Sequence, residues 1–294
     1  MTNPYAITGA SGRTGSAAAQ ALLDRGLPVR VILRNPAKAN VWHARGAEVA
    51  IADLDDVDAM SAALADTSGA YIVSPQQYDR EHLFERAIVI AETVETAVRR
   101  AAVPLIVALS SVGAGKDHDI GWIAMNRSLE QALGRLPIPV AFLRAAYFME
   151  NWQPMIQQAM STGYLPSFLA PLQRALPMVA TTDIGSIAAD VLQQEWHSQR
   201  IIDLAGPAEY SPANVAFSLS RQVGRSVNAV AIAEKDWAAV LAGTGMSNAA
   251  REGFVEMTRG LNSGHIAFGN PVGHECLSGT TSLDQAVAKL IVTR

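Results

Sequence analysis

The chain has 294 residues, of which 49% are hydrophobic and 17% charged, and its formal net charge is −4. This length fits one large domain or two modest ones with an ample core. An acidic chain without a basic field argues against nucleic acid or an anionic membrane as a partner. The single cysteine, Cys276, excludes internal disulfides, and we expect it to be buried as a small hydrophobe.

Neither a targeting segment nor a membrane span is predicted. The N-terminal residues lack the charged and apolar regions of a signal peptide, and no run approaches the ~18 apolar residues of a membrane helix. The six histidines, at 43, 82, 118, 197, 265 and 274, show no metal-ligand spacing, so no metal is expected. These observations predict a cytoplasmic protein.

Three evenly spaced glycines follow a short apolar strand at 5–8 and precede a helix at 16–23. A strand, a glycine turn and a helix N-terminus in this order form a phosphate cradle. The first glycine permits the tight turn, the second lets a pyrophosphate approach the backbone, and the third lets the helix lie close to the strand. The residues of this turn expected at a dinucleotide are Gly9, Ser11, Gly12, Arg13, Thr14 and Gly15.

Strands alternate with helices through the first half of the chain. Such alternation predicts a Rossmann-type, doubly wound parallel sheet with helices on both faces. The expected strands are 5–8, 29–33, 48–52, 70–74, 103–109 and 140–143, and the expected helices are 16–23, 57–64, 80–102 and 126–136.

The pattern loosens after residue 147, where prolines punctuate short segments rich in Met, Phe and Trp. We predict a helix at 182–194, capped by Thr182 or Asp183. The other expected elements are a strand at 200–204, helices at 212–223, 234–242 and 282–290, and a glycine-spaced tail at 260–279. The expected division is a dinucleotide domain at 1–150, completed by about 178–206, and a smaller mixed α/β substrate-side lobe at 151–177 and 207–294.

The choice of dinucleotide depends on the end of the second strand. An NAD site carries an acidic residue there, whereas this chain has Arg34, and Arg13 can approach the same corner. A guanidinium suits a 2′-phosphate, so NADP(H) is the predicted cofactor, the alternative being that both arginines are solvated surface charges. Asp53 is placed to reach an adenine edge or to cap the next helix.

Polar residues end the fourth and fifth strands. Ser74 and Pro75 follow the fourth strand, and Ser110 and Ser111 follow the fifth. At these strand ends they are expected to line the ribose and nicotinamide side of the cofactor. For the two later serines, hydrogen bonding within their own loop is an equal alternative.

Several motifs together resemble the NmrA-like group of atypical short-chain dehydrogenases. The resemblance covers the whole chain, and its motifs lie at 8–15, 33–38, 53–54, 72–75, 142–152 and 279–283. Within the group the chain is most similar to bacterial NAD(P)H:quinone oxidoreductases and triphenylmethane-dye reductases. The resemblance implies an NADP-binding Rossmann domain with a smaller C-terminal lobe. The group also contains members that bind the dinucleotide only to sense redox state.

The resemblance also implies roles for individual residues. It makes Arg34 the 2′-phosphate ligand, adds Leu54 beside the adenine site, and places Tyr147 and Phe148 near the nicotinamide. Related proteins carry Lys or His at the helix position of Asn126. No tyrosine here has a lysine four residues later, so the usual acid pair is absent. No catalytic residue is therefore assigned, and Asn126 is the one candidate.

The absence of this acid pair affects which acceptors the protein can reduce. A ketone needs a proton donor as hydride arrives, whereas a quinone or cationic dye gives a delocalised or neutral product. The sequence therefore favours an NADPH-dependent reductase of quinones or similar conjugated acceptors, with hydride supplied by the cofactor. A non-catalytic NADP(H) sensor fits equally well, and an imine or ene reductase is a third interpretation. Lys116 is a conceivable substitute acid or a solvated loop lysine.

Aromatic and methionine side chains in the second half could form a flat pocket for an acceptor ring. The alternative is that they pack the lobe onto the sheet. The members of this predicted cluster are Tyr147, Phe148, Trp152, Phe168, Met125, Met149 and Met155. The predicted substrate contacts are Gln77, Tyr147, Asn151 and Trp152. The expected partners are a small aromatic or quinone-like substrate and a second copy of the chain in a homodimer.

Overall fold

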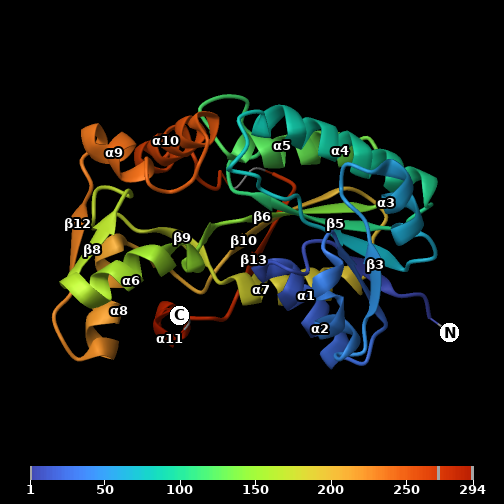
Figure 1. Ribbon diagram of the computed structural model, residues 1–294, viewed down its shortest axis with the longest axis horizontal. Coiled ribbons are helices and arrows are strands. Elements are labelled where there is room, and N and C mark those ends of the chain that lie inside the picture. The colour runs from blue at the N-terminus through green and yellow to red at the C-terminus, as the bar shows by residue number, and fades with distance from the viewer. Residues whose placement is uncertain (1, 270–271, 293–294) are drawn as a thin grey trace.

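A central sheet of eight parallel strands runs through the computed structural model, which describes residues 2–269 and 272–292 (Figure 1). Across the sheet the strands are β13 (His274–Ser278), β10 (Arg200–Ala205), β6 (Val140–Ala145), β5 (Ile106–Ser111), β4 (Gly69–Ile72), β1 (Tyr5–Ile7), β2 (Val29–Leu33) and β3 (Glu48–Ile51). Strands covered on both faces need continuous apolar runs, which explains the Val-, Ile- and Ala-rich sequences of β2, β5 and β6.

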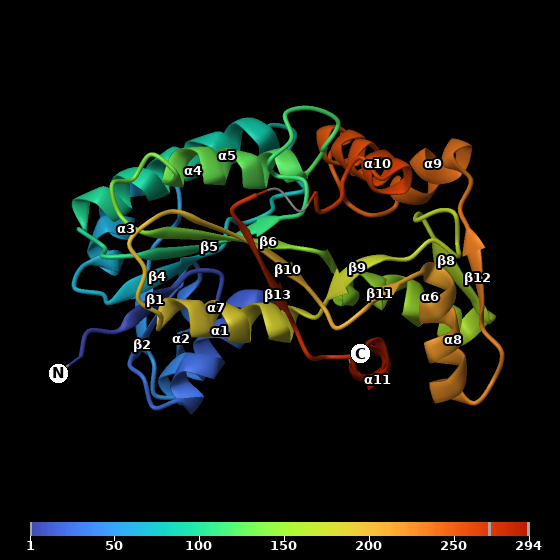
Figure 2. The same cartoon turned by 180° about the vertical axis from the view of Figure 1, so that it is seen from behind.

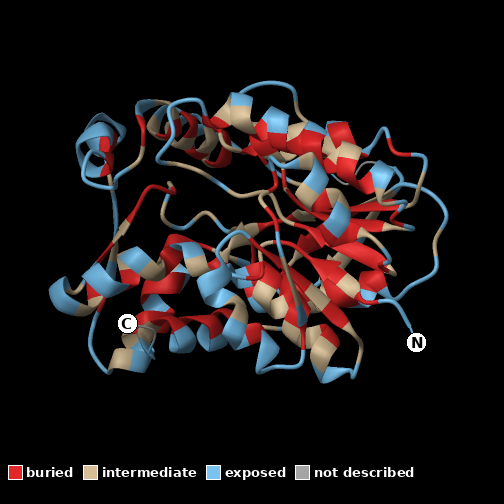
Figure 3. Cartoon of the chain, turned by 45° about the vertical axis from the view of Figure 1, so that its right-hand side comes forward, coloured by how far each residue is buried: buried red, intermediate tan, exposed pale blue. Residues whose placement is uncertain are grey.

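Helices cover both faces of this sheet (Figures 1 and 2). One face carries α1 (Arg13–Asp24), α2 (Ala39–His43) and α7 (Thr181–Leu192), and the other carries α3 (Val57–Leu64), α4 (Leu83–Arg100) and α5 (Ile123–Leu133). Alternate strand residues form the two cores, because successive side chains of a strand point to opposite faces. The buried strands stand out in Figure 3. The predicted Rossmann-type fold class is confirmed.

The order of the strands reverses beside β1, which pairs with β2 on one side and with β4 on the other. Ligands of open parallel sheets bind outside the carboxyl ends of the strands at such a reversal. Thr8 holds the two strand ends together there, since its Oγ1 accepts a hydrogen bond of 2.7 Å from the Val73 N–H. The topology therefore puts the ligand edge beside the glycine turn.

The lobe beyond β6 contains two small sheets, β11-β9-β7 and β12-β8. Its core includes Trp152, Ile156 and Leu165, all at most 1% exposed. The remaining elements are η1 (Pro36–Lys38) in the first half and, in the lobe, β7 (Tyr147–Phe148), η2 (Met149–Trp152), α6 (Gln153–Thr162), β8 (Tyr164–Ser167), β9 (Leu176–Val179), β11 (Glu209–Tyr210), α8 (Pro212–Val223), β12 (Asn228–Ala231), η3 (Glu234–Asp236), α9 (Trp237–Leu241), α10 (Asn248–Ser263) and α11 (Leu283–Val292).

The predicted cap of α7 is wrong. The N-cap residue is Ala180, and the carboxylate of Glu150 accepts the Thr181 N–H at 3.0 and 3.1 Å. Asp183 instead accepts hydrogen bonds from the N–H and hydroxyl of Thr281, at 2.8 and 2.7 Å. A carboxylate from a distant segment can satisfy helix N–H groups as well as a local cap does, and the local sequence contains no sign of it.

The glycine-spaced tail also differs from expectation, because it contains the end of α10 and the whole of β13. The segment assigned to the lobe thus supplies a strand to the main sheet, pairing with β10. Cys276 lies on β13 and is exposed rather than buried, since β13 is an edge strand. The division into two domains remains a prediction.

Neither a membrane-spanning helix nor a metal-ligand cluster occurs in the described part of the chain. No helix within residues 2–269 and 272–292 is long and apolar enough to cross a membrane. The same part of the chain contains no group of three or more His, Cys, Asp or Glu side chains that could hold a metal ion.

Candidate functional site

The glycine turn presents backbone donors at the start of α1. Gly12 is the N-cap residue, and no side chain caps this helix among the described residues. The first N–H to bond within the helix is that of Ser16, which donates to the Gly12 carbonyl at 3.2 Å. The earlier N–H groups, together with the positive end of the helix dipole, therefore form a site for an anion.

Two glycines in this turn could not be replaced without moving the backbone. Gly9 has a φ of +65°, which L side chains rarely adopt. A Cβ on Gly15 would lie 2.4 Å from the carbonyl carbon and oxygen of Gly9. The strand, turn and helix thus approach as closely as a dinucleotide cradle requires, and the residues present fit a pyrophosphate.

Arg34 follows β2 directly and is exposed at the ligand edge. Its side chain makes neither a hydrogen bond nor an ion pair with residues 2–269 or 272–292. Asp53, at the end of β3, is half-buried and does not cap α3. Asp56 does so, accepting the N–H groups of Asp58 and Ala59 at 3.0 and 2.9 Å. Both Arg34 and Asp53 therefore remain available to a ligand.

The Arg13 side chain is bonded to the lobe, and its predicted approach to the corner of Arg34 stays a prediction. The Arg13 guanidinium donates a hydrogen bond to the side chain of Gln153, the first residue of α6. A cavity of about 170 Å³ opens beside the pair, bounded also by Glu150 and Thr181. The start of α6 lies against the start of α1, so the Arg13 side chain links the glycine turn to the lobe.

Four more predicted contacts belong to loops near the ligand edge, and three of them follow β4. Ser74, Pro75 and Gln77 are all half-buried there. The Gln77 side-chain oxygen accepts a hydrogen bond of 2.8 Å from Arg86, which also bonds to Asp55 at 2.7 Å. The fourth, Leu54, lies in the loop after β3 and is packed in the core at 8% exposure, so its side chain is not available to a ligand.

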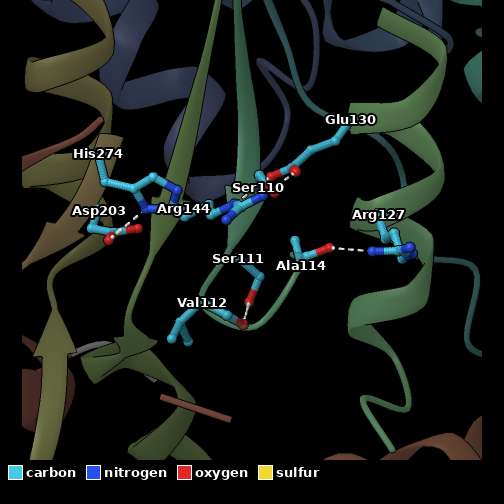
Figure 4. Close-up of polar contacts among 9 residues, drawn as sticks. All are labelled: Ser110, Ser111, Val112, Ala114, Arg127, Glu130, Arg144, Asp203 and His274. Atoms are coloured by element: carbon cyan, nitrogen blue, oxygen red, sulfur yellow. Dashed lines mark hydrogen bonds and ion pairs between the residues drawn. The ribbon is translucent and has the colours of Figure 1, made fainter. Parts of the chain in front are cut away.

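Ser110 points away from the ligand edge. It is 2% exposed, and its hydroxyl donates a hydrogen bond of 2.5 Å to Glu130 of α5 (Figure 4). Ser111 is half-buried, and its hydroxyl donates to the Val112 carbonyl at 3.1 Å. Of the two, only Ser111 is partly exposed at this edge, so the predicted role of Ser110 would have to be met by its backbone.

Asn126 lies in the first turn of α5, one helical turn before Glu130 and on the same side of the helix. It is half-buried, and its amide has no hydrogen-bond partner in the described part of the chain. Lys116 lies in the preceding loop, is also half-buried, and likewise has no side-chain partner there. Both side chains are therefore free to meet a ligand at this end of the sheet.

Tyr147 and Asn151 lie together after β6. Burial raises the pKa of Tyr147, and its hydrogen bond with the Asn151 side chain opposes that rise. Phe148 packs against the core on the α1 side. Trp152 is 1% exposed, with an indole N–H that has no partner among the described residues, so it contributes to the core of the lobe rather than to a surface that a ligand can reach.

The predicted aromatic cluster is divided among four places, of which the α1-side core, with Phe148, is one. Tyr147, Trp152 and Met149 lie in the lobe core. Phe168 packs edge-on against Trp237 and Phe254, with ring centroids 5.9 and 5.0 Å apart. Met125 belongs to a third cluster, between α4 and α10. The seven side chains therefore do not form one pocket.

The sequence interpretation missed four polar residues that lie close together beneath the ligand edge. They are Glu130, Arg144, Asp203 and His274 (Figure 4). A signal was present in the sequence, because Arg144 and Asp203 each interrupt an apolar run within a strand. Polar residues inside a buried strand need partners, and this need could have drawn attention to them.

Comparison with known proteins identifies the family. The model of the NmrA-like family matches residues 1–288. The chain belongs to the NmrA-like family. Among curated members, it is 28% identical over 255 residues to the NAD(P)H azoreductase of Xenophilus azovorans, covering 85% of each chain. It is 24% identical over 292 residues to quinone oxidoreductase 2 of Escherichia coli, covering 97% of this chain and 98% of the other.

Solved structures of other NmrA-like proteins have the same fold. The NADPH complex of the Escherichia coli NADPH-dependent quinone oxidoreductase superimposes with a TM-score of 0.81 at 24% identity, covering 98% of this chain and 99% of the other. The Citrobacter triphenylmethane reductase complexed with NADP(H) gives 0.80 at 21% identity, with coverages of 98% and 99%.

Proposed function

We propose that this NmrA-like protein is an NADPH-dependent oxidoreductase that transfers hydride to a quinone or a similar conjugated acceptor. Support comes from relatives named as a quinone oxidoreductase and an azoreductase over most of the chain. The observation that carries the proposal is the edge of the sheet itself, where the uncapped start of α1 lies beside the unpaired guanidinium of Arg34.

Arg34 selects the phosphorylated dinucleotide in this proposal. The glycine turn would hold the pyrophosphate, and Arg34 at the end of β2 would hold the 2′-phosphate through charge-assisted hydrogen bonds. Asp53 would receive the adenine edge. The nicotinamide end would then extend over β4, β5 and β6, toward Ser111, Asn126 and Tyr147.

The chemistry at the far end needs little from the protein beyond positioning. NADPH, when bound, supplies the hydride. Asn126 can donate a hydrogen bond to an oxygen of the acceptor but cannot release a proton. A quinone product spreads its charge over the ring and takes protons from water, so the asparagine is sufficient. The protein holds donor and acceptor in line.

Substitution of Arg34 tests the cofactor assignment. We expect Arg34→Ala to raise the Kd of NADPH roughly 10–100-fold, which is the loss of a hydrogen bond to a charged group, and to leave NADH affinity unchanged. Fluorescence titration measures both. Arg45→Ala is the matched control, because Arg45 is also exposed but lies over the Trp42 ring, 4.9 Å from its centroid. Equal losses for NADPH and NADH would contradict the assignment.

Steady-state assays with NADPH and a panel of quinones test the reaction. We expect turnover well above the rate in buffer. If NADPH binds but no acceptor is reduced, the oxidoreductase proposal fails and the sensor interpretation, which Asn126 favours, takes its place. Calorimetry with the oxidised and reduced forms of both dinucleotides would then test the sensor, which must bind NADP and NADPH with different affinities.

A further inference from the structure

Three charged or polar side chains form a row across the sheet, close to its ligand edge. Arg144 of β6 is the register partner of Ser110 on β5 and of Asp203 on β10. The residues before them on β5 and β6 are apolar and buried. This polar row therefore lies directly beneath the carboxyl ends of the strands, on the face that α5 covers (Figure 4).

The row is closed by side chains from both ends. Glu130 of α5 accepts two hydrogen bonds from the Arg144 guanidinium, at 2.9 and 2.7 Å, and the Ser110 hydroxyl at 2.5 Å. At the other end, His274 Nδ1 lies 3.0 Å from an Asp203 carboxylate oxygen. The bonded group of Ser110, Glu130 and Arg144 thus lies next to the bonded pair of Asp203 and His274, because Arg144 and Asp203 are register neighbours on adjacent strands.

Burial makes this polar row costly to leave incomplete. The side chains of Arg144 and Glu130 are 12% and 11% exposed, and that of Asp203 is 5% exposed. Burial on its own would lower the pKa of Arg144, but the hydrogen bonds and charge of Glu130 outweigh it, aided by the charge of Asp203, and the pKa is raised. A buried ion pair often adds little stability over an apolar replacement, so a positional role is the better account of it.

The loop between β5 and α5 rests directly on Arg144. A Cβ built on Gly115 would lie 2.9 Å from Arg144 Nη1. The same loop is held by the Val112 N–H, which donates to the Ala145 carbonyl at 2.9 Å, and by Arg127, which donates to the Ala114 carbonyl at 3.3 Å. The guanidinium of Arg144 thus packs against the underside of this loop.

We propose that Glu130 and Arg144 are positioning residues for the part of the ligand edge where the acceptor would bind. They fix the loop 111–116 from below, and they fix the first turn of α5, which carries Asn126 one turn before Glu130. The pair acts through Ser111, the loop backbone and Asn126, and contacts neither cofactor nor acceptor. The proposal rests on the proposed function insofar as turnover reports it.

Glu130→Gln is the main test, because it keeps the shape of the side chain and removes its charge. We expect kcat/KM for a quinone to fall roughly 10–100-fold, because misplaced reacting groups lower the rate by factors of this size. The Kd of NADPH should stay within about threefold of wild type, since the glycine turn follows β1 and Arg34 follows β2, both on the far side of β4. Glu275→Gln removes a carboxylate from another bidentate pair, with Arg200 at the start of β10 and away from the carboxyl ends of the strands, and it should change neither quantity.

Hydrogen–deuterium exchange supplies a readout that does not depend on activity. In Glu130→Gln we expect faster exchange across 111–126 and unchanged exchange in α1. If the wild type reduces no quinone, the proposed function fails, yet this exchange result still decides the positioning role. Unchanged exchange and unchanged kinetics in a folded Glu130→Gln protein would overturn the proposal, as would equal losses in NADPH binding and turnover.

Gly115→Ala approaches the same contact from the exposed side and avoids a buried substitution. The added methyl group would press on Arg144, which Glu130 holds in place, and should displace the loop. We expect the same direction of change in kcat/KM as for Glu130→Gln, at smaller size, with the Kd of NADPH retained. A Gly115→Ala protein with wild-type kinetics would contradict the contact between loop and guanidinium.

Discussion

Two arginine–glutamate pairs of nearly identical geometry involve neighbouring strands, one near the carboxyl end of β6 and the other at the start of β10. Arg144 meets Glu130 through bonds of 2.9 and 2.7 Å beneath the ligand edge. Arg200 meets Glu275 through bonds of 2.7 and 2.6 Å at the start of β10, beside the Trp196 ring. Both arginines are mostly buried, but Glu130 is 11% exposed and Glu275 is 42% exposed. The same bidentate geometry therefore occurs once in a buried setting and once at the protein surface.

The difference shows that the role of an ion pair depends on the segments that pack against it. Arg200 lies over the Trp196 ring and donates a hydrogen bond to the Gln194 side chain, and the carboxylate of its partner Glu275 is partly exposed to water. Arg144 carries a loop and the N-terminal turn of α5, and a second buried carboxylate, Asp203, faces it. Breaking the inner pair should therefore affect both stability and the ligand edge, whereas breaking the outer pair should affect stability alone.

The largest expected effect is on stability. Arg144→Met removes the cation and leaves the Glu130 and Asp203 carboxylates buried without it, which should cost about 3–5 kcal/mol. Arg200→Met should cost less than half of that, because water solvates the exposed carboxylate of Glu275. Urea unfolding of the two variants measures the difference. Equal losses would show that burial of the carboxylate does not distinguish the pairs.

Much of this fold follows from the sequence, and the reason is local. The strand Val29–Leu33 and the helices Val57–Leu64 and Pro212–Val223 have the predicted bounds, since each is a clear apolar period between turn residues. Arg34 could be predicted as a site residue because the end of an apolar strand locates it in a Rossmann sheet.

What was missed depends on contacts between distant segments. No helix was predicted at 248–263, where Gly253 and Gly260 let α10 pack closely against its neighbours. A Cβ on Gly253 would lie 2.8 Å from the Trp122 ring, and one on Gly260 would lie 2.5 Å from Ile266. Likewise the direction of the Ser110 hydroxyl is decided by Glu130, on another element. A single sequence contains no record of such pairings.

An intermediate loss of stability is expected from a substitution in loop 111–116, which contacts Arg144 and not Arg200. Gly115→Ala should cost about 1 kcal/mol, as overpacking does, because the new methyl group meets Arg144 Nη1 at 2.9 Å. In an Arg144→Met background the same change should cost clearly less, since the shorter side chain leaves room. Gly243→Ala is the control, as its added Cβ would meet nothing within 4 Å. Equal costs in both backgrounds would rule out the contact.

The smallest effect concerns the outer pair and its dependence on pH. The hydrogen bonds from Arg200 lower the pKa of Glu275 below its ordinary value of 4.5. A lowered carboxyl pKa contributes stability above the unfolded-state pKa, and that stability is lost as the pH falls through the folded-state pKa. Glu275→Gln should therefore be less stable than wild type near neutral pH, by about 1 kcal/mol or less.

The difference in stability between Glu275→Gln and wild type should shrink as the pH falls below about 4.5, the ordinary pKa of this carboxyl. The wild-type carboxylate then takes up a proton and loses its charge-assisted hydrogen bonds. Urea midpoints at a series of pH values measure the difference, with kcat/KM for the quinone recorded on the same proteins at neutral pH. A pH-independent difference would show that Arg200 does not act through the charge of Glu275. A change in kcat/KM would show that the pair far from the ligand edge also positions the acceptor, and the contrast between the two pairs would be lost.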